Sequence, residues 1–229
     1  MQNLNIKNNN TACVIIHGYA GGTFEVEYLC DYLKSNGINA FLVKLAGHGA
    51  TAAELAKTDE TQWLASAKEQ IEEIYKNNSR LILIGFSMGG LISANLVNEF
   101  KAVKMVTINT PYFVFSLKNI IKTFFSKSVP LKQRLRFYSM SIKKTTPKSN
   151  ADFLRLLKST RKIFAEIKCP VMIVQTEDDT TSRPKSALRI AAKVGAGAKV
   201  KYYPVGEHLV LLSEAKDDVC KDILSFVTE

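Results

Sequence analysis

The sequence predicts an α/β protein built on a mostly parallel, doubly wound sheet with a helical insertion, and three patterns indicate this class. Short, nearly continuous apolar runs recur along the chain, as in strands that are buried on both faces of a parallel sheet. Amphipathic helical patterns separate these runs, and such an alternation implies right-handed crossovers. One interval, between about residues 110 and 169, has helical patterns but no convincing strand.

The expected elements alternate along the chain. The expected strands are residues 12–16, 40–43, 81–84, 103–108, 171–174 and 200–203. The expected helices of the core are residues 26–33, 60–75, 91–100, 185–194 and 217–226. A chain of 229 residues that is 46% hydrophobic can bury one large core. We therefore expect a single domain, with a core of residues 1–110 and 169–229 and a helical cap of residues 111–168.

Three apolar stripes with helical spacing predict the helices of the cap. The first runs from Leu117 to Phe125, with apolar side chains at i, i+3, i+4, i+7 and i+8. The second runs from Leu131 to Ile142 and the third from Phe153 to Phe164. Asn150 precedes the third stripe as a suitable N-cap residue. We expect these stripes to face the sheet.

The cap also carries the basic excess of the chain. Residues 116–168 hold 14 Lys or Arg and two acids, a net charge of +12, whereas the whole chain has +10 and the remainder therefore −2. The simplest interpretation is that the charges keep the cap solvated. A second hypothesis is attraction to an anionic phospholipid surface or to an anionic thioester such as an acyl-CoA. We expect no nucleic-acid partner, because no recognised binding motif accompanies the charge.

The composition also bounds the environment of the protein. The amino-terminal residues lack the cationic and apolar regions of a signal peptide, and no apolar run approaches the roughly 20 residues of a membrane span. Four widely separated cysteines form no CxxC pair and fit reduced core positions. We expect a soluble, cytoplasmic protein. The three histidines, at positions 17, 48 and 208, have no metal-ligand spacing, so no metal site is expected.

Residues 81–90 carry the first motif with chemical meaning. An apolar strand is followed by the G-x-S-x-G pattern of Gly85 to Gly89 and then by a helix. Ser87 on such a tight turn is exposed as a nucleophile, and the glycines let strand and helix approach each other. The pattern alone is only moderately specific, because a glycine-rich turn with an N-capping serine has the same letters.

A second turn follows the first expected strand, at His17-Gly18-Tyr19. The backbone N–H groups of Tyr19 and of Met88, the residue after Ser87, would form an oxyanion hole for a tetrahedral intermediate. His17 is an alternative catalytic histidine. It precedes the serine, however, whereas in this arrangement the acid and then the histidine follow the nucleophile.

An acid and a histidine follow the last two expected strands in that order. Glu177, Asp178 and Asp179 come just after one strand, and His208 comes just after the next. Polar groups at the carboxyl ends of parallel strands collect at one edge of the sheet. A carboxylate there can orient the His208 imidazole while the imidazole takes the proton of Ser87.

Together these motifs resemble the bacterial carboxylesterase and monoacylglycerol lipase family of α/β-hydrolases. The resemblance rests on residues 17–19, 47–49, 85–89, 175–187 and 206–208, and it weakens only in the insertion. Aligning Gln175 and Pro184 with the family pattern selects Asp179 as the acid, with Asp178 as the alternative. The resemblance also implies a cofactor-free triad of Ser87, Asp179 and His208. It further implies a cap whose aromatic side chains shape an acyl pocket: Phe113, Phe115, Phe124, Phe125, Phe137 and Tyr138.

The expected function is therefore that of a serine hydrolase that cleaves carboxylic esters, either short or medium acyl esters or monoacylglycerols, through an acyl-enzyme on Ser87. An acyl-CoA thioesterase or acyltransferase with the same triad is the alternative, motivated by the basic cap. A hydrolase-fold binding protein without catalysis is a third hypothesis. Every triad position is filled, which argues against it.

Overall fold

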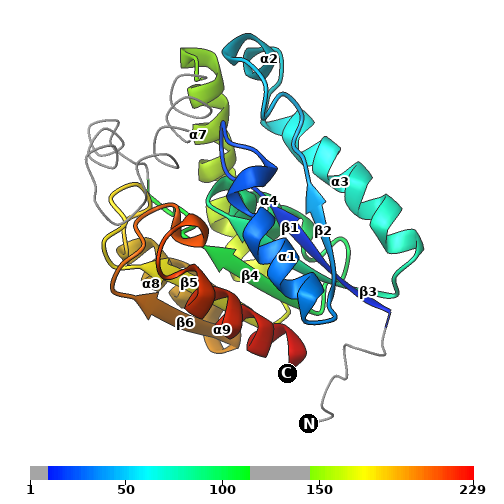
Figure 1. The fold of residues 1–229 in the computed structure, drawn as a ribbon. Helices are drawn as coiled ribbons and strands as arrows, with labels where there is room; N and C mark the ends of the chain where they lie inside the picture. Colours follow the sequence, from blue (N-terminus) through cyan, green and yellow to red (C-terminus); the bar gives the residue numbers. More distant parts are fainter. Residues whose placement is uncertain (1–9, 114–144) are drawn as a thin grey trace.

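A six-stranded parallel sheet forms the centre of the computed structural model, which describes residues 10–113 and 145–229 (Figure 1). The strands are β1 (Thr11–Ile16), β2 (Asn39–Val43), β3 (Arg80–Phe86), β4 (Lys104–Ile108), β5 (Val171–Thr176) and β6 (Ala198–Tyr203). Their order is β2-β1-β3-β4-β5-β6, and every neighbouring pair is parallel. All six expected strands are present within two residues of their expected ends. Strand β2 lies on one side of β1 at the edge of the sheet, and β3 lies on the other side of β1. This reversal of the strand order creates a topological switch point.

Helices cover both faces of the sheet. They are α1 (Glu27–Ser35), α2 (Ala52–Ala56), α3 (Glu60–Lys76), α4 (Met88–Leu96), α7 (Pro147–Ile163), α8 (Lys185–Val194) and α9 (Lys216–Thr228). Figure 1 shows α1 and α9 together on one face, and α3, α4, α7 and α8 supply the apolar side chains of the other. In β1, Cys13 and Ile15 point to the first face, and Val14 and Ile16 point to the second. Burial on both faces explains why the strands are continuously apolar.

Two helices differ from their expected bounds by more than two residues. Helix α4 begins at Met88, directly after Ser87, and ends at Leu96, where we expected residues 91–100. Helix α7 begins at Pro147, so the prediction that Asn150 caps it is wrong. Thr146 is the N-cap: its hydroxyl accepts the N–H of Ser149, whose hydroxyl in turn accepts the N–H of Thr146. A proline suits the first helical position because its fixed φ fits the helix and its missing N–H has no partner to lose.

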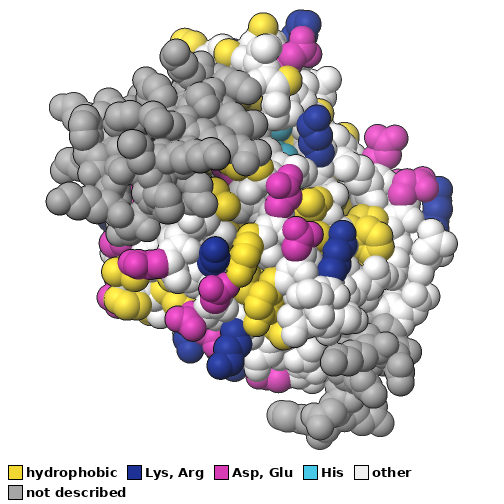
Figure 2. All heavy atoms as spheres, viewed as in Figure 1, with side chains coloured by type: hydrophobic (Ala, Val, Ile, Leu, Met, Phe, Trp, Pro, Cys, Tyr) yellow, Lys and Arg dark blue, Asp and Glu magenta, His cyan; other side chains and the backbone are white. Residues whose placement is uncertain are grey.

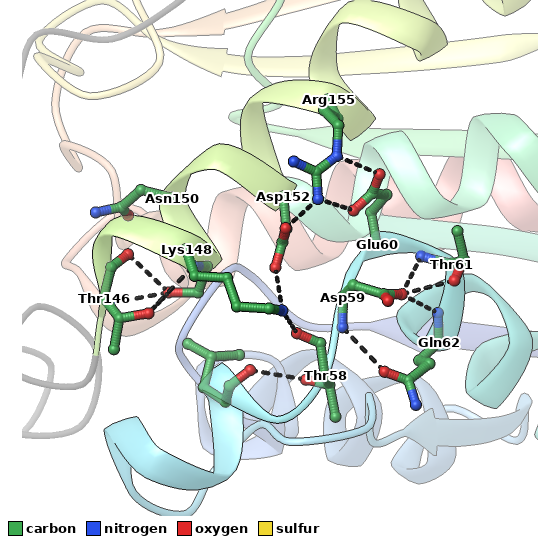
Figure 3. A network of polar contacts seen from close by, with 12 residues as sticks. Thr58, Asp59, Glu60, Thr61, Gln62, Thr146, Lys148, Asn150, Asp152 and Arg155 are labelled. Carbon is green, nitrogen blue, oxygen red and sulfur yellow. Dashed lines mark hydrogen bonds and ion pairs between the residues drawn. The ribbon is translucent and has the colours of Figure 1, made fainter.

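Helix α7 is fixed to the start of α3 by buried and half-buried charges (Figure 3). The Asp152 carboxylate is 1% exposed and is paired with Lys148 at 3.0 Å and with Arg155. The Arg155 guanidinium also makes two hydrogen bonds with Glu60, at 2.7 and 3.0 Å. Lys148 Nζ donates to the carbonyl of Thr58 at 2.9 Å. Paired in this way, the buried carboxylate avoids the cost of an isolated charge.

The third predicted stripe lies on the buried face of α7 and just after it. Phe153, Leu157, Thr160 and Phe164 are all at most 1% exposed, so the stripe is buried as predicted, but α7 packs mainly on α4 and α3 and not directly on the sheet. The two other stripes, at residues 117–125 and 131–142, lie outside the described residues. The extent of the cap, residues 111–168, therefore stays a prediction.

The described surface carries both signs of charge. Figure 2 shows acidic and basic side chains interspersed over the face that contains α1 and α9. This agrees with the small net charge of the chain outside residues 116–168. Within residues 10–113 and 145–229, no helix is both long and apolar enough to cross a membrane.

Candidate active site

Loops from four strands meet at the carboxyl edge of the sheet. They follow β1, β3, β5 and β6, and they carry Tyr19, Ser87, Asp179 and His208 respectively. The carboxyl ends of parallel strands share one edge, which explains how residues far apart in sequence come together.

Ser87 lies on a strained turn between β3 and α4. Its φ of 51° is in the left-handed region that disfavours side chains, and its N–H donates to the carbonyl of Ile108 at 2.8 Å. A Cβ on Gly85 would lie 2.2 Å from the carbonyl carbon of Gly89, and one on Gly89 would lie 2.1 Å from the carbonyl oxygen of Ile16. The expected tight turn is therefore present, and no larger residue fits at either glycine without movement of the backbone.

A chain of hydrogen bonds connects Asp179, His208 and Ser87. His208 Nε2 lies 3.0 Å from Ser87 Oγ, and His208 Nδ1 lies 2.9 Å from Asp179 Oδ2. Because an ionised carboxylate only accepts, Nδ1 carries the proton and Nε2 is left to accept from the serine hydroxyl. All three residues are at most 7% exposed. This geometry is suited to removing the proton of Ser87.

The two neighbouring acids have different partners. Asp179 Oδ1 accepts the N–H groups of Thr181 at 2.7 Å and Ser182 at 2.8 Å, so its carboxylate is fixed on the side away from the imidazole. Asp178 instead accepts the N–H groups of Gly206 at 3.2 Å and Glu207 at 2.7 Å. The sequence left Asp178 open as the acid. In the structure, Asp179 is hydrogen-bonded to His208, whereas Asp178 is hydrogen-bonded to the backbone of the loop that carries His208.

His17 and His48 are buried near the turn after β1, and neither ring is hydrogen-bonded to Ser87. His17 Nε2 accepts the N–H of Leu45 at 3.1 Å, and Nδ1 donates to the carbonyl of Gly18 at 2.9 Å. Burial lowers the pKa of His17 to about 4 and that of His48 to about 3, so both rings stay neutral at neutral pH. His17 therefore braces the turn, and the imidazole that meets the serine is His208.

Tyr19 anchors the predicted oxyanion turn to α7. Its phenolic O–H has two acceptors within reach, Ser149 Oγ at 2.8 Å and Asn150 Oδ1 at 3.0 Å, and its ring packs on Phe153 with the centroids 4.9 Å apart. Among the described residues, the N–H groups of Tyr19 and Met88 donate no hydrogen bond. Met88 is the first residue of α4, where an N–H lacks an intrahelical acceptor. Both donors are therefore available to a ligand.

One predicted pocket residue is described. Phe113 comes shortly after β4 in the sequence, and the ammonium of Lys185 lies 4.6 Å from the centroid of the Phe113 ring. The remaining predicted pocket residues, Phe115, Phe124, Phe125, Phe137 and Tyr138, lie outside the described residues. In the described parts of the chain, no three His, Cys, Asp or Glu side chains gather as a metal site would require.

Comparison of the sequence with known protein families identifies the family of the chain. A family model described as "Serine aminopeptidase, S33" matches residues 7–140, more than half of the chain. The chain belongs to this family. The matched residues include the turn after β1 and the whole of the strand–Ser87–helix motif.

Individual relatives of this S33-family chain cover most of its length. It is 23% identical over 230 aligned residues to a carboxylesterase of Bacillus subtilis (strain 168), with 96% of the chain and 94% of the relative covered. It is 22% identical to a thermostable monoacylglycerol lipase of Bacillus sp. (strain H-257), with coverage of 79% and 75%. A solved structure from work on the metagenome-derived lipolytic enzymes LipS and LipT superimposes with a TM-score of 0.83 at 18% identity, covering 96% and 94%. The fold is that of the α/β-hydrolases.

Sequence reasoning missed Asn109 and Thr176, which hold the histidine loop of this S33-family protein. Asn109 Nδ2 donates to the carbonyls of Glu207 at 2.7 Å and His208 at 2.9 Å, while its Oδ1 accepts the N–H of Thr176 at 2.9 Å. The hydroxyl of Thr176 also donates to the Glu207 carbonyl at 2.5 Å. Asn109 has a φ of 45°, which asparagine tolerates better than most residues. The only sequence signal was a polar residue at the end of a strand.

Proposed function

We propose that this protein is a serine hydrolase that cleaves carboxylic esters, with Ser87, His208 and Asp179 as its catalytic triad. The observation that carries the proposal is the continuous hydrogen-bond chain from Asp179 through His208 to the strained Ser87. Membership of the S33 family and the similarity to a carboxylesterase and a monoacylglycerol lipase support ester bonds as the target.

The geometry suggests how each group acts. Ser87 Oγ attacks the ester carbonyl carbon while its proton passes to His208 Nε2, and Asp179 stabilises the imidazolium that forms. The carbonyl oxygen becomes an oxyanion, which the N–H groups of Tyr19 and Met88 would bind. His208 then gives the proton to the leaving alcohol as the C–O bond breaks, which leaves an acyl group on Ser87. Water, deprotonated by His208, releases the acid and restores the serine, and no step requires a cofactor.

The proposed substrates are short or medium acyl esters and monoacylglycerols. The similarity to a carboxylesterase and to a monoacylglycerol lipase supports these two classes. The acyl pocket of the six aromatic residues, the contact of the basic cap with anionic lipid, and the cytoplasmic location all stay predictions from the sequence. Sedimentation with liposomes, with and without anionic lipid, tests the lipid contact. Equal binding to both would reject it.

Release of p-nitrophenol from acyl esters tests the activity. Because deacylation follows a separate acylation step, a two-step enzyme releases a burst of about one equivalent of nitrophenol when deacylation is the slower step. We expect turnover of short or medium acyl esters, and a panel that adds monoacylglycerols and acyl-CoAs assigns the leaving group. If acyl-CoA is hydrolysed faster than the matching simple ester, the thioesterase alternative replaces the esterase assignment. Absence of turnover on the whole panel would reject both.

Replacing Asn109 by glycine is expected to lower kcat for a good ester about 10- to 100-fold, because small displacements of a catalytic group have effects of this size. Glycine accepts the φ of 45° at this position, so the variant removes the side-chain bonds to the His208 loop without adding backbone strain. KM should change little, since the bonds orient His208 and do not contact substrate. Steady-state kinetics measure the split. An unchanged kcat in a folded N109G protein would contradict this role.

A further inference from the structure

Glu25 presents a buried carboxyl group to the turn that carries Tyr19. It ends the short helix η1 (Thr23–Glu25) and is only 2% exposed. Its Oε2 accepts the N–H of Gly18 at 2.9 Å, whereas its Oε1 has no hydrogen-bond partner among the described residues. Gly18 directly precedes Tyr19, so this hydrogen bond orients the peptide next to the N–H that the proposed oxyanion hole uses.

The backbone of the same turn packs directly on the carboxyl group. A Cβ on Gly21 would lie 2.2 to 2.3 Å from the two oxygens and the carbon of the Glu25 carboxyl. A Cβ on Gly18 would lie 3.1 Å from Glu25 Oε2 and equally close to the ring of Phe86. The Phe86 ring in turn packs on the imidazole of His208, with 5.2 Å between the centroids. The carboxyl group, the turn and the triad histidine therefore form one packed unit.

The environment of Glu25 also changes its acidity. Burial raises the pKa of Glu25 from 4.5 to about 7, whereas the N–H of Gly18, a positive charge on His208 when that imidazole is protonated, and the N–H of Gly22 each lower it. Among the described titratable side chains, His208 is the one that acts on Glu25. An ionised carboxylate is a stronger acceptor for an N–H than a neutral carboxyl group is. The strength of the Gly18 hydrogen bond thus changes near neutral pH.

We propose that Glu25 is a positioning residue, which holds residues 18–22 in the shape that the oxyanion hole requires and holds them more firmly when it is ionised. This inference rests on the proposed function, because it assigns the N–H of Tyr19 to the developing oxyanion. Glu25 acts through Gly18 and does not touch the substrate. It is a carboxyl group of the site that the triad chemistry does not use.

Two substitutions separate the hydrogen bond from the charge. Glu25→Gln keeps a side-chain oxygen that can accept the Gly18 N–H, and Glu25→Ala removes it. A fluorophosphonate is a suitable probe, because its phosphoryl oxygen occupies an oxyanion hole during attack by Ser87 whatever the natural substrate is. We expect E25A to react about 10- to 100-fold more slowly, as a misplaced catalytic group does, and E25Q to recover most of the rate. Labelling of E25A at the wild-type rate would overturn the proposal.

Gly21→Ala tests the packing from the side of the turn. Gly21 does not have a positive φ, and the three atoms nearest to a Cβ at this position all belong to the Glu25 carboxyl group. We expect G21A to slow labelling in the wild-type background, because the carboxyl group must move out of its site. In the E25A background the same substitution should add little, since the space is then free. Equal effects of G21A in both backgrounds would show that the turn does not depend on the carboxyl group.

The dependence of the melting temperature on pH gives a readout that needs neither substrate nor probe. A carboxyl group whose pKa is higher in the folded protein contributes stability below the unfolded pKa, and this stability is lost as pH rises from about 4.5 to about 7. The melting temperature of E25Q relative to wild type should therefore rise between pH 5 and pH 8. The acid limb of kcat/KM should move to lower pH in E25Q. An identical difference in melting temperature at both pH values would show that Glu25 does not titrate in this range.

The results distinguish a failure of the proposed function from a failure of the positioning role of Glu25. If the chain hydrolyses no ester but the pH-dependent difference in melting temperature is present, the proposed function is wrong and the buried carboxyl group is still titrating. If esters are hydrolysed and E25A matches the wild-type labelling rate, the function stands and Glu25 has no positioning role.

Discussion

Replacement of Ser87 by alanine is expected to lower kcat for ester hydrolysis by about 10⁴- to 10⁶-fold, the range found when a triad nucleophile is removed. Within residues 10–113 and 145–229, the nucleophile that the His208 imidazole meets is this hydroxyl, at 3.0 Å. What remains should be the small contribution of the oxyanion hole and of substrate binding. Rates of p-nitrophenyl ester hydrolysis with purified wild-type and S87A protein measure the effect.

Ser93 offers a matched control on the same helix. Its hydroxyl is fully buried in α4 and has no hydrogen-bond partner among the described residues. Ser93→Ala should therefore leave stability and kcat nearly unchanged, because removing an unpaired buried hydroxyl costs little. Hydrolysis that survives in S87A at a rate near that of S93A would mean that Ser87 is not the nucleophile.

The second large effect is expected at Asp179. Asp179→Asn should lower kcat about 10⁴-fold, because an amide no longer accepts the Nδ1 proton and no longer stabilises the imidazolium. Asp178→Asn is the matched control one residue away. It retains an oxygen for one of the two loop N–H groups, and we expect a loss below about tenfold, typical of a weakened hydrogen bond. Steady-state kinetics of both variants on one ester decide between the acids.

Reversal of this order would assign the catalytic acid to Asp178, which the sequence had left open. Melting temperatures of the two variants serve as the control for folding. Both carboxylates accept backbone N–H groups, so each substitution is expected to cost some stability. The kcat values should therefore be compared at a temperature below the melting temperatures of both variants.

The sequence predicted the sheet and the tight turn at Ser87 because both depend on local patterns with a physical cause. Strands buried on two faces must be apolar throughout, and a serine on a tight turn needs small neighbours such as Gly85 and Gly89. The bounds of α4 were harder to predict from the sequence. Its residues from Met88 to Ala94 are all buried, so no polar face marks where the helix begins.

Contacts between residues far apart in the sequence could not be predicted from local sequence patterns. Asn109 meets the carbonyl of Glu207 from another strand end, and Asp178 clamps Gly206, and no local spacing announces either contact. Asn150 illustrates a local failure: two adequate caps lay close together, and the capping box of Thr146 with Ser149 prevailed. Asn150 instead accepts the hydroxyl of Tyr19.

The most direct test of the central claim is to identify the residue that a fluorophosphonate modifies. The folded protein is labelled, digested and analysed by mass spectrometry, with S87A and S93A treated in parallel. We expect one adduct, on Ser87, in wild type and S93A, and none in S87A. An adduct on another residue, or a wild-type protein that is folded and hydrolyses esters but takes no label, would contradict it.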